Sequence, residues 1–293
     1  MQKNLKKLIA VIIIIFALLG VRFFVYWNAY RIPIIAPTAS LQDIGLVHEV
    51  IGQSVQMRNI DAYTYGNGPT HLLFVGGIHG GYEWNSVLLA YMFMDYLELN
   101  PDAIPANVTI TIIPSANPDG IFAVVGKQGR FMVAEVSTST KVLESGRFNA
   151  RDVDINRNFD CKWQAKSIWR SKTVSAGSEA FSEPEARAIR DYVSKNKISA
   201  AIFWHSQSNA VYASQCEDGI LPKTLDIMNV YSKAAGYPAV KTFDAYATTG
   251  AVDDWLASIG IPAITVELKT HDTIEWDKNL AGIKALFGYF AEK

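Results

Sequence analysis

The 293-residue sequence has few cysteines, few histidines and no excess of charge of either sign. It contains two cysteines and five histidines, and its 27 basic and 28 acidic residues give a formal net charge of −1. The spacing of Cys161 and Cys216 fits neither a zinc knuckle nor a redox motif. The lack of a basic excess argues against a nucleic-acid-binding protein. Hydrophobic residues make up 49%, which is enough for the core of one large α/β domain or two small ones.

A long apolar run follows the basic N-terminus. Three lysines among the first seven residues precede an apolar stretch from residue 8 to Trp27 that is interrupted by Arg22. A stretch of about 20 residues can span a bilayer, and the lysines favour a cytoplasmic N-terminus. We therefore expect an uncleaved signal-anchor or transmembrane helix at residues 1–27, with the rest of the chain outside the cytoplasm at the cell membrane. The alternative is a cleaved signal peptide and a secreted protein, although no convincing small-residue cleavage site is present.

The rest of the chain has the pattern of one α/β domain. Residues 28–43, with Pro33 and Pro37, are typical of a linker, which leaves a domain at 44–293. Alternating apolar and helical patterns predict a parallel or mixed sheet covered on both faces, with the active site at the carboxyl ends of its strands. Strands are expected at 54–65, 71–75, 108–113, 199–204 and 262–268, and helices at 84–99, 183–195, 221–235 and 277–290.

Two of the five histidines stand where a metal site could form. His79 lies in a glycine-rich turn between a strand and a helix, Glu83 opens that helix, and His205 ends another strand. Two histidines and a glutamate form a known set of catalytic zinc ligands. Taken alone, the segment fits a tight turn equally well, with Glu83 complementing the helix dipole. Surface positions or local hydrogen bonds are expected for the other three histidines, which are His48, His71 and His271.

A single carboxylate interrupts the apolar strand expected at 262–268. Glu267 would be costly to bury without a partner. It is therefore either paired structurally, or it has a raised pKa that suits proton transfer. The residues of this strand alone do not decide between the two.

Several short motifs occur in one order along residues 52–268. They are Gly52-Gln53-Ser54, the His79 turn, Asn117-Pro118-Asp119-Gly120, Asp154-Ile155-Asn156-Arg157-Asn158-Phe159, Ser182-Glu183-Pro184-Glu185, His205-Ser206, Gly250 through Asp254-Trp255, and Glu267-Leu268. Each is weak alone, but together the chain resembles the zinc carboxypeptidases related to carboxypeptidases A and B. The resemblance implies a single domain with a mixed eight-stranded twisted sheet, helices on both faces and one catalytic Zn²⁺ ion.

The resemblance also implies a role for each matching residue. The zinc ligands would be His79, Glu83 and His205, and Glu267 would be the catalytic base. The C-terminal carboxylate of a peptide substrate would be bound by Asn156 and Arg157, because a guanidinium fork matches a carboxylate. One departure concerns the metal turn, where three residues separate His79 from Glu83 instead of the usual two. If the glycines do not absorb the extra residue, the zinc site is in doubt.

Two further roles depend on sequence offsets. Arg147, nine residues before Asn156, resembles the arginine that polarises the scissile carbonyl in shorter bacterial members, with Arg151 and Arg130 as competitors. Tyr246, eight residues before Asp254, resembles the tyrosine that caps the substrate's terminus, although it is explained equally well as an ordinary loop aromatic.

The substrate is less determined than the reaction. In the resemblance, Asp253 lies on the floor of the pocket for the terminal side chain, where it would favour lysine or arginine. Alternatively, Asp253 turns outward as a helix-start residue. Two other functions stay open: hydrolysis of cell-wall (murein) peptides at diaminopimelate, and a catalytically inactive peptide-binding module. The module is disfavoured because the expected ligands and Glu267 are all present.

The two cysteines follow loops that should border the site. Cys161 comes after the Asn156 loop and Cys216 after the His205 strand. We expect them to form a disulfide that braces the site, with two buried free thiols as the alternative. The expected protein is a monomer whose partners are a peptide with a free C-terminus and the membrane.

Overall fold

The computed structural model describes residues 46–292. The predicted signal-anchor at 1–27 and the predicted linker at 28–43 lie outside the described residues. Within 46–292, no helix combines the length and the apolar character needed to cross a membrane.

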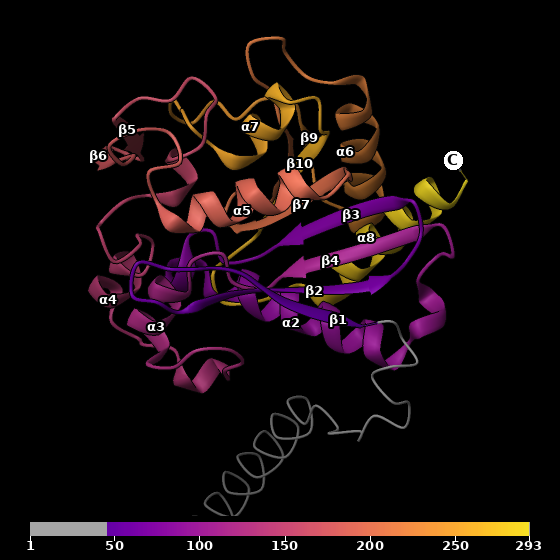
Figure 1. Ribbon diagram of the computed structural model, residues 1–293, viewed down its shortest axis with the longest axis horizontal. Helices are drawn as coiled ribbons and strands as arrows, with labels where there is room; N and C mark the ends of the chain where they lie inside the picture. The colour runs from indigo at the N-terminus through magenta and orange to yellow at the C-terminus, as the bar shows by residue number, and fades with distance from the viewer. Residues whose placement is uncertain (1–45, 293) are drawn as a thin grey trace, which may run out of the picture. The chain divides into compact units, whose positions relative to one another are not determined.

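The described part of the chain contains one mixed sheet of eight strands, in the spatial order β1-β2-β4-β3-β7-β10-β8-β9 (Figure 1). Three neighbouring pairs are parallel in its centre, namely β4–β3, β3–β7 and β7–β10. The mixed eight-stranded sheet expected from the sequence is confirmed. The strands are β1 (Val47–Gln53), β2 (Asn59–Gly66), β3 (Thr70–Val75), β4 (Val108–Ile113), β7 (Ile198–Ser206), β8 (Ala210–Ala213), β9 (Ala239–Val240) and β10 (Ala263–Leu268).

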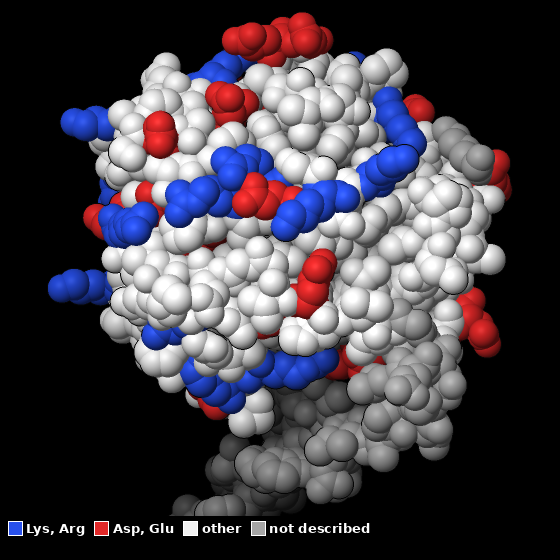
Figure 2. All heavy atoms as spheres, viewed as in Figure 1, with Lys and Arg blue, Asp and Glu red and all other residues white. Residues whose placement is uncertain are grey.

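Helices cover both faces of the sheet because the central strands are apolar on both sides. In β3, Leu72 and Phe74 join one core cluster, whereas Leu73 and Val75 join the other, as the alternation of strand side chains requires. The first cluster packs against α2 (Trp84–Leu99), α6 (Pro222–Ala235) and α8 (Trp276–Ala291). The second packs against α5 (Pro184–Lys195) and α7 (Val252–Ser258). Figure 2 shows charged side chains in a band along the outer face of α5.

The strand expected at 54–65 begins too early. β1 ends at Gln53, and the chain then turns, with the Ser54 N–H donating to the Arg58 carbonyl at 2.8 Å and Met57 at φ 61°. β2 starts only at Asn59. The segment 54–65, which was expected to be one strand, therefore consists of a turn followed by most of β2.

Several elements were not expected from the sequence, most of them short, because a few residues carry too little periodicity. Besides β1, β8 and β9, these are α3 (Pro118–Val125), α4 (Thr140–Ser145), α7, and a separate antiparallel hairpin of β5 (Lys166–Trp169) and β6 (Lys172–Ser175).

The carboxyl ends of three central strands bring the candidate site residues together. β3 ends just before the His79 turn, and His205 is the penultimate residue of β7. β10 pairs in parallel with β7 so that Glu267 lies beside His205 in register. The sheet therefore fixes the relative positions of residues that lie far apart in the sequence.

Candidate metal centre and active site

The three expected metal ligands meet at the ends of β3 and β7. Nδ1 of His79 lies 2.8 Å from one carboxylate oxygen of Glu83, and Nδ1 of His205 lies 3.0 Å from the other. The two ring nitrogens are 3.2 Å apart. All three side chains are buried, and one ligand atom from each lies within 4.8 Å of the others.

The extra residue in the metal turn is absorbed by a 3₁₀ turn over Gly80–Glu83. Gly80 has φ 44°, which favours glycine, and a Cβ on Gly81 would lie 2.4 Å from Val124. The side chain of Tyr82 packs against Trp169 and His271. Glu83 therefore faces both histidines despite the unusual spacing.

The donor set fits a zinc ion. Burial alone would raise the pKa of Glu83, but the charges of His79 and His205 outweigh it and hold that pKa well below its ordinary range. Burial would likewise lower the pKa of His205, but the Glu83 carboxylate raises it. Two imidazole nitrogens with one buried carboxylate are ligands that zinc prefers in catalytic sites.

Asp154 supports this cluster, a role that the sequence interpretation missed. Its carboxylate lies 3.4 Å from Nε2 of His79 and accepts hydrogen bonds from Nε and Nη2 of Arg147 at 3.0 and 2.8 Å. Burial would raise the pKa of Asp154, but Arg147 and then His79 hold it well below its usual range. Carboxylates that orient a ligand histidine are a common feature of metal sites. The one feature of the sequence that could have pointed to this role is the position of Asp154, two residues before Asn156.

Of the three candidate arginines, Arg147 lies at the site. It is buried, its Nη1 lies 3.7 Å from Glu83, and it lines the pocket. Arg151 is exposed and pairs with Glu183. Arg130 pairs with Asp95. Their positions leave Arg147 as the arginine that can reach a substrate carbonyl.

One pocket opens from the metal cluster and contains every remaining predicted site residue. These residues are Asn156, Arg157, Tyr246, Asp253 and Glu267. The pocket walls also contain residues to which the sequence interpretation gave no role, because they come from separate strands, loops and a helix that only the fold brings together. Those are Tyr212, Gln215, Phe243, Thr248, Asp254 and Thr265.

Glu267 has the properties of a base that works near neutral pH. Burial and then the Glu83 carboxylate raise the pKa of Glu267 to about 7, against the opposing charge of His205. Its carboxylate accepts a hydrogen bond from the Ser208 N–H at 3.1 Å. A carboxyl with such a pKa can both take and return a proton.

Asn156 and Arg157 are held rigidly at the pocket. The Asn156 side chain accepts a hydrogen bond from the Val252 N–H at 3.0 Å. The Arg157 guanidinium donates to the carbonyls of Asn156 and Ile168, at 2.7 and 3.2 Å. Its buried Nε has no hydrogen-bond partner within residues 46–292. A fixed guanidinium with a spare buried donor suits a carboxylate ligand.

Asp253 and Tyr246 both face the pocket. Asp253 is buried near the start of α7 and accepts a hydrogen bond from the Thr265 hydroxyl at 3.0 Å. It is therefore not the outward-facing helix-start residue that the sequence left open. Burial and then the Asp253 carboxylate raise the pKa of the adjacent Asp254 to about 8. Tyr246 packs against Phe243, and burial raises the pKa of Tyr246.

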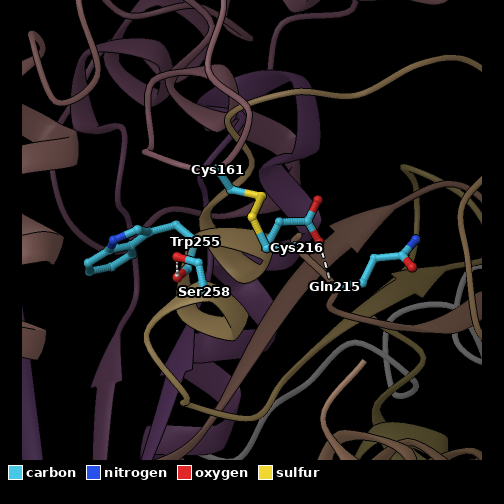
Figure 3. The surroundings of a disulfide bond; sticks show 6 residues. Cys161, Gln215, Cys216, Trp255 and Ser258 are labelled. Atoms are coloured by element: carbon cyan, nitrogen blue, oxygen red, sulfur yellow. Dashed lines mark hydrogen bonds between the residues drawn. A yellow bond between two sulfur atoms is a disulfide. The ribbon is translucent and has the colours of Figure 1, made fainter. Parts of the chain in front are cut away.

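The expected Cys161–Cys216 disulfide is present (Figure 3). The Cys161 carbonyl accepts a hydrogen bond from Gly250 at 2.8 Å, and Gln215, next to Cys216, donates its N–H to Asp254 at 2.9 Å. The bond thus joins the Asn156–Arg157 loop to the wall of the pocket, rather than touching the metal ligands. Its two cysteines are 55 residues apart in the sequence, and a disulfide typically stabilises a protein by about 2–4 kcal/mol.

The histidines outside the metal cluster form hydrogen bonds with neighbouring side chains. His48 is bonded to Asp61 and His71 to Thr111, each at 2.8 Å. Nδ1 of His271 lies 2.6 Å from the hydroxyl of Ser206. Ser206 directly follows the metal ligand His205 in the sequence. No feature of the sequence indicated that His271 would contact the residue next to a metal ligand.

Comparisons with known proteins agree with this geometry. A family model described as zinc carboxypeptidase matches residues 42–280. The chain is 23% identical over 238 residues to gamma-D-glutamyl-L-diamino acid endopeptidase 1 of Lysinibacillus sphaericus, covering 74% of this chain but only 59% of that protein. It is 25% identical over 254 residues to carboxypeptidase B of Astacus astacus, covering 80% of both.

Two solved structures have a similar fold. Bovine thrombin-activatable fibrinolysis inhibitor aligns with a TM-score of 0.66 at 20% identity, over 85% of this chain and 89% of that one. Murein-tripeptide amidase from Escherichia coli O157 aligns with a TM-score of 0.60 at 20% identity, over 82% and 91%.

Proposed function

Because this chain belongs to the zinc carboxypeptidase family, we propose that it is a metallocarboxypeptidase that hydrolyses the C-terminal peptide bond of peptides. The observation that carries the proposal is the convergence of the His79–Glu83–His205 cluster, Glu267 and Arg157 on one pocket. Retention of Glu267 beside the cluster disfavours an inactive peptide-binding module.

Each residue has a distinct part in the proposed reaction. A zinc ion held by the cluster would polarise the scissile carbonyl and lower the pKa of a water molecule towards about 7. Glu267 accepts the proton of the attacking water and later donates it to the leaving amine. Arg147 donates hydrogen bonds to the carbonyl oxygen as negative charge develops. Asn156 and Arg157 bind the terminal carboxylate and so place the last peptide bond at the site.

A requirement for a free C-terminus tests this function. A lysine-terminated peptide should lose its last residue, whereas its C-terminal amide should react at least about 10²-fold more slowly, because a buried charged hydrogen-bond pair is lost. Mass spectrometry of the products measures both rates. Equal rates, or cleavage at internal bonds only, would exclude a carboxypeptidase.

We further propose a preference for basic terminal residues, supported by the buried carboxylate of Asp253 in the pocket. In the wild type, kcat/KM should be higher for a terminal lysine than for a terminal phenylalanine. Asp253→Asn should lower this ratio by about tenfold or more, because a buried carboxylate rewards a cation. The exposed Asp102→Asn is the matched control. A ratio that Asp253→Asn leaves unchanged would remove Asp253 from specificity.

Murein peptides are the second candidate substrate. The relative from Lysinibacillus sphaericus is named for cleavage at a diamino acid, and diaminopimelate also carries an amine that would suit Asp253. Comparing muropeptides with ordinary lysine-terminated peptides under one assay separates the two substrates.

We also propose that the domain acts outside the cytoplasm. The disulfide supports this location, since such bonds persist in oxidising compartments.

A further inference from the structure

An aromatic cluster borders the metal end of the pocket and takes no part in the proposed reaction. Tyr82 immediately precedes Glu83, and its ring lies edge-to-face with Trp169 at 5.2 Å between centroids. Phe148 and Tyr246 pack against the same cluster. Because Tyr246 also lines the pocket, the cluster borders the pocket at that residue, and we call the cluster the Tyr82–Trp169 wall.

Two arginines stand over this wall. The guanidinium carbon of Arg147 lies 4.7 Å from the Trp169 ring centroid and 5.9 Å from that of Tyr82. The guanidinium carbon of Arg170 lies 5.5 Å from the Trp169 ring centroid and 6.0 Å from the Tyr82 ring centroid. Arg147 is buried and neutralised by Asp154. Arg170 is exposed, and within residues 46–292 no carboxylate pairs with it.

The β5–β6 hairpin holds Arg170 in this position. Trp169 pairs with Lys172 across the hairpin, so Arg170 and Ser171 form its two-residue turn. Arg170 has φ 55°, a conformation that non-glycine residues adopt rarely and at a cost. Lys172 is paired with Glu144 at 3.0 Å. Figure 2 shows basic side chains standing out at the edge where Figure 1 places the hairpin. Of these two charges at the turn, that of Arg170 remains available to a ligand.

The direction of a bound peptide follows from the two ends of the pocket. The terminal residue lies towards Arg157 and Asp253, beyond the scissile bond. The Tyr82–Trp169 wall borders Arg147, which lines the pocket and whose Nη1 lies 3.7 Å from Glu83, so the wall lies towards the metal end, where the rest of the peptide leaves the site. The side chain next to the scissile bond on its N-terminal side is thus the one that can reach the wall.

We infer that Arg170 and the Tyr82–Trp169 wall form a subsite for an acidic residue directly N-terminal to the scissile bond. A guanidinium group that stacks on aromatic rings pairs well with a carboxylate. Together with Asp253 at the opposite end, the pocket then selects an acidic residue followed by a basic terminal one. This specificity rests on the proposed carboxypeptidase function.

Three N-acylated peptides that end in Glu-Lys, Gln-Lys and Lys-Lys test the subsite on the full chain. The wild type should prefer Glu-Lys over Gln-Lys by about 2–5-fold in kcat/KM, the size of a solvent-exposed ion pair, and should disfavour Lys-Lys. The preference should weaken at high salt, because salt screens exposed charges. Arg170→Gln should bring the Glu-Lys to Gln-Lys ratio close to 1.

Arg190→Gln is the control, since it removes an arginine of α5 that is paired with Asp191 and does not line the pocket; it should keep the wild-type ratio. A ratio unchanged by Arg170→Gln, or a wild-type ratio of 1, would overturn the subsite. If no peptide is hydrolysed, the carboxypeptidase proposal fails instead. The ratio of the dissociation constants of the Glu-Lys and Gln-Lys peptides, measured by calorimetry on wild type and Arg170→Gln, then tests the subsite independently.

Discussion

Replacing Glu267 with glutamine is expected to lower kcat/KM for a lysine-terminated peptide by about 10³–10⁴-fold while the protein keeps its zinc. Glutamine has nearly the same size, but it cannot accept the proton of the attacking water, and general bases contribute on this scale. The zinc content should stay at the wild-type level, because the ligands are three other residues. Steady-state kinetics and elemental analysis of the same preparation measure both quantities.

Glu49→Gln provides the matched control, since Glu49 is exposed on the edge strand β1. It should behave as wild type in both assays. A Glu267→Gln variant that retains activity within tenfold of wild type would show that another group takes the proton. Loss of zinc from that variant would instead make Glu267 a ligand.

Replacing His205 with alanine is expected to remove zinc binding and activity together. His205 supplies one of two nitrogen ligands and lies at the carboxyl end of the central strand β7. Two remaining ligands do not form a catalytic zinc site. Activity should fall by at least about 10³-fold, and added zinc should not restore it under conditions that reactivate chelator-treated wild type. His48→Ala, which removes an exposed histidine bonded to Asp61, is the control. Wild-type zinc affinity in His205→Ala would contradict the assignment.

The sequence predicted those site residues whose positions follow from strand ends. His205 and Glu267 lie at the ends of apolar strands, and neighbouring parallel strands bring such ends to one edge. The central strands and the longer helices were also predictable, because their hydrophobic patterns span enough residues.

The position of Glu83 could not be settled from the sequence. Whether three intervening residues still allow Glu83 to face His79 depends on the left-handed φ of Gly80 and on the close approach of Val124 to Gly81. Val124 lies in α3, about 40 residues further along the chain. Such a long-range contact leaves no mark on the local pattern.

Several other residues of the pocket walls were likewise beyond sequence reasoning. Gln215 and Phe243 lie in loops, and their neighbours come from distant parts of the chain. Arg170 is one of several arginines in the sequence, and only the β5–β6 hairpin places it over Tyr82. Specificity therefore depends on tertiary contacts to a greater extent than the reaction type does.

Anomalous diffraction at the zinc absorption edge, from crystals of the protein, tests the metal centre most directly. We expect one peak, about 2.0–2.1 Å from Nδ1 of His79 and from Nδ1 of His205, with a Glu83 oxygen as the third protein ligand. A peak bound by other side chains, or one that Glu83 does not reach, would contradict the three-residue centre on which the proposed hydrolysis depends.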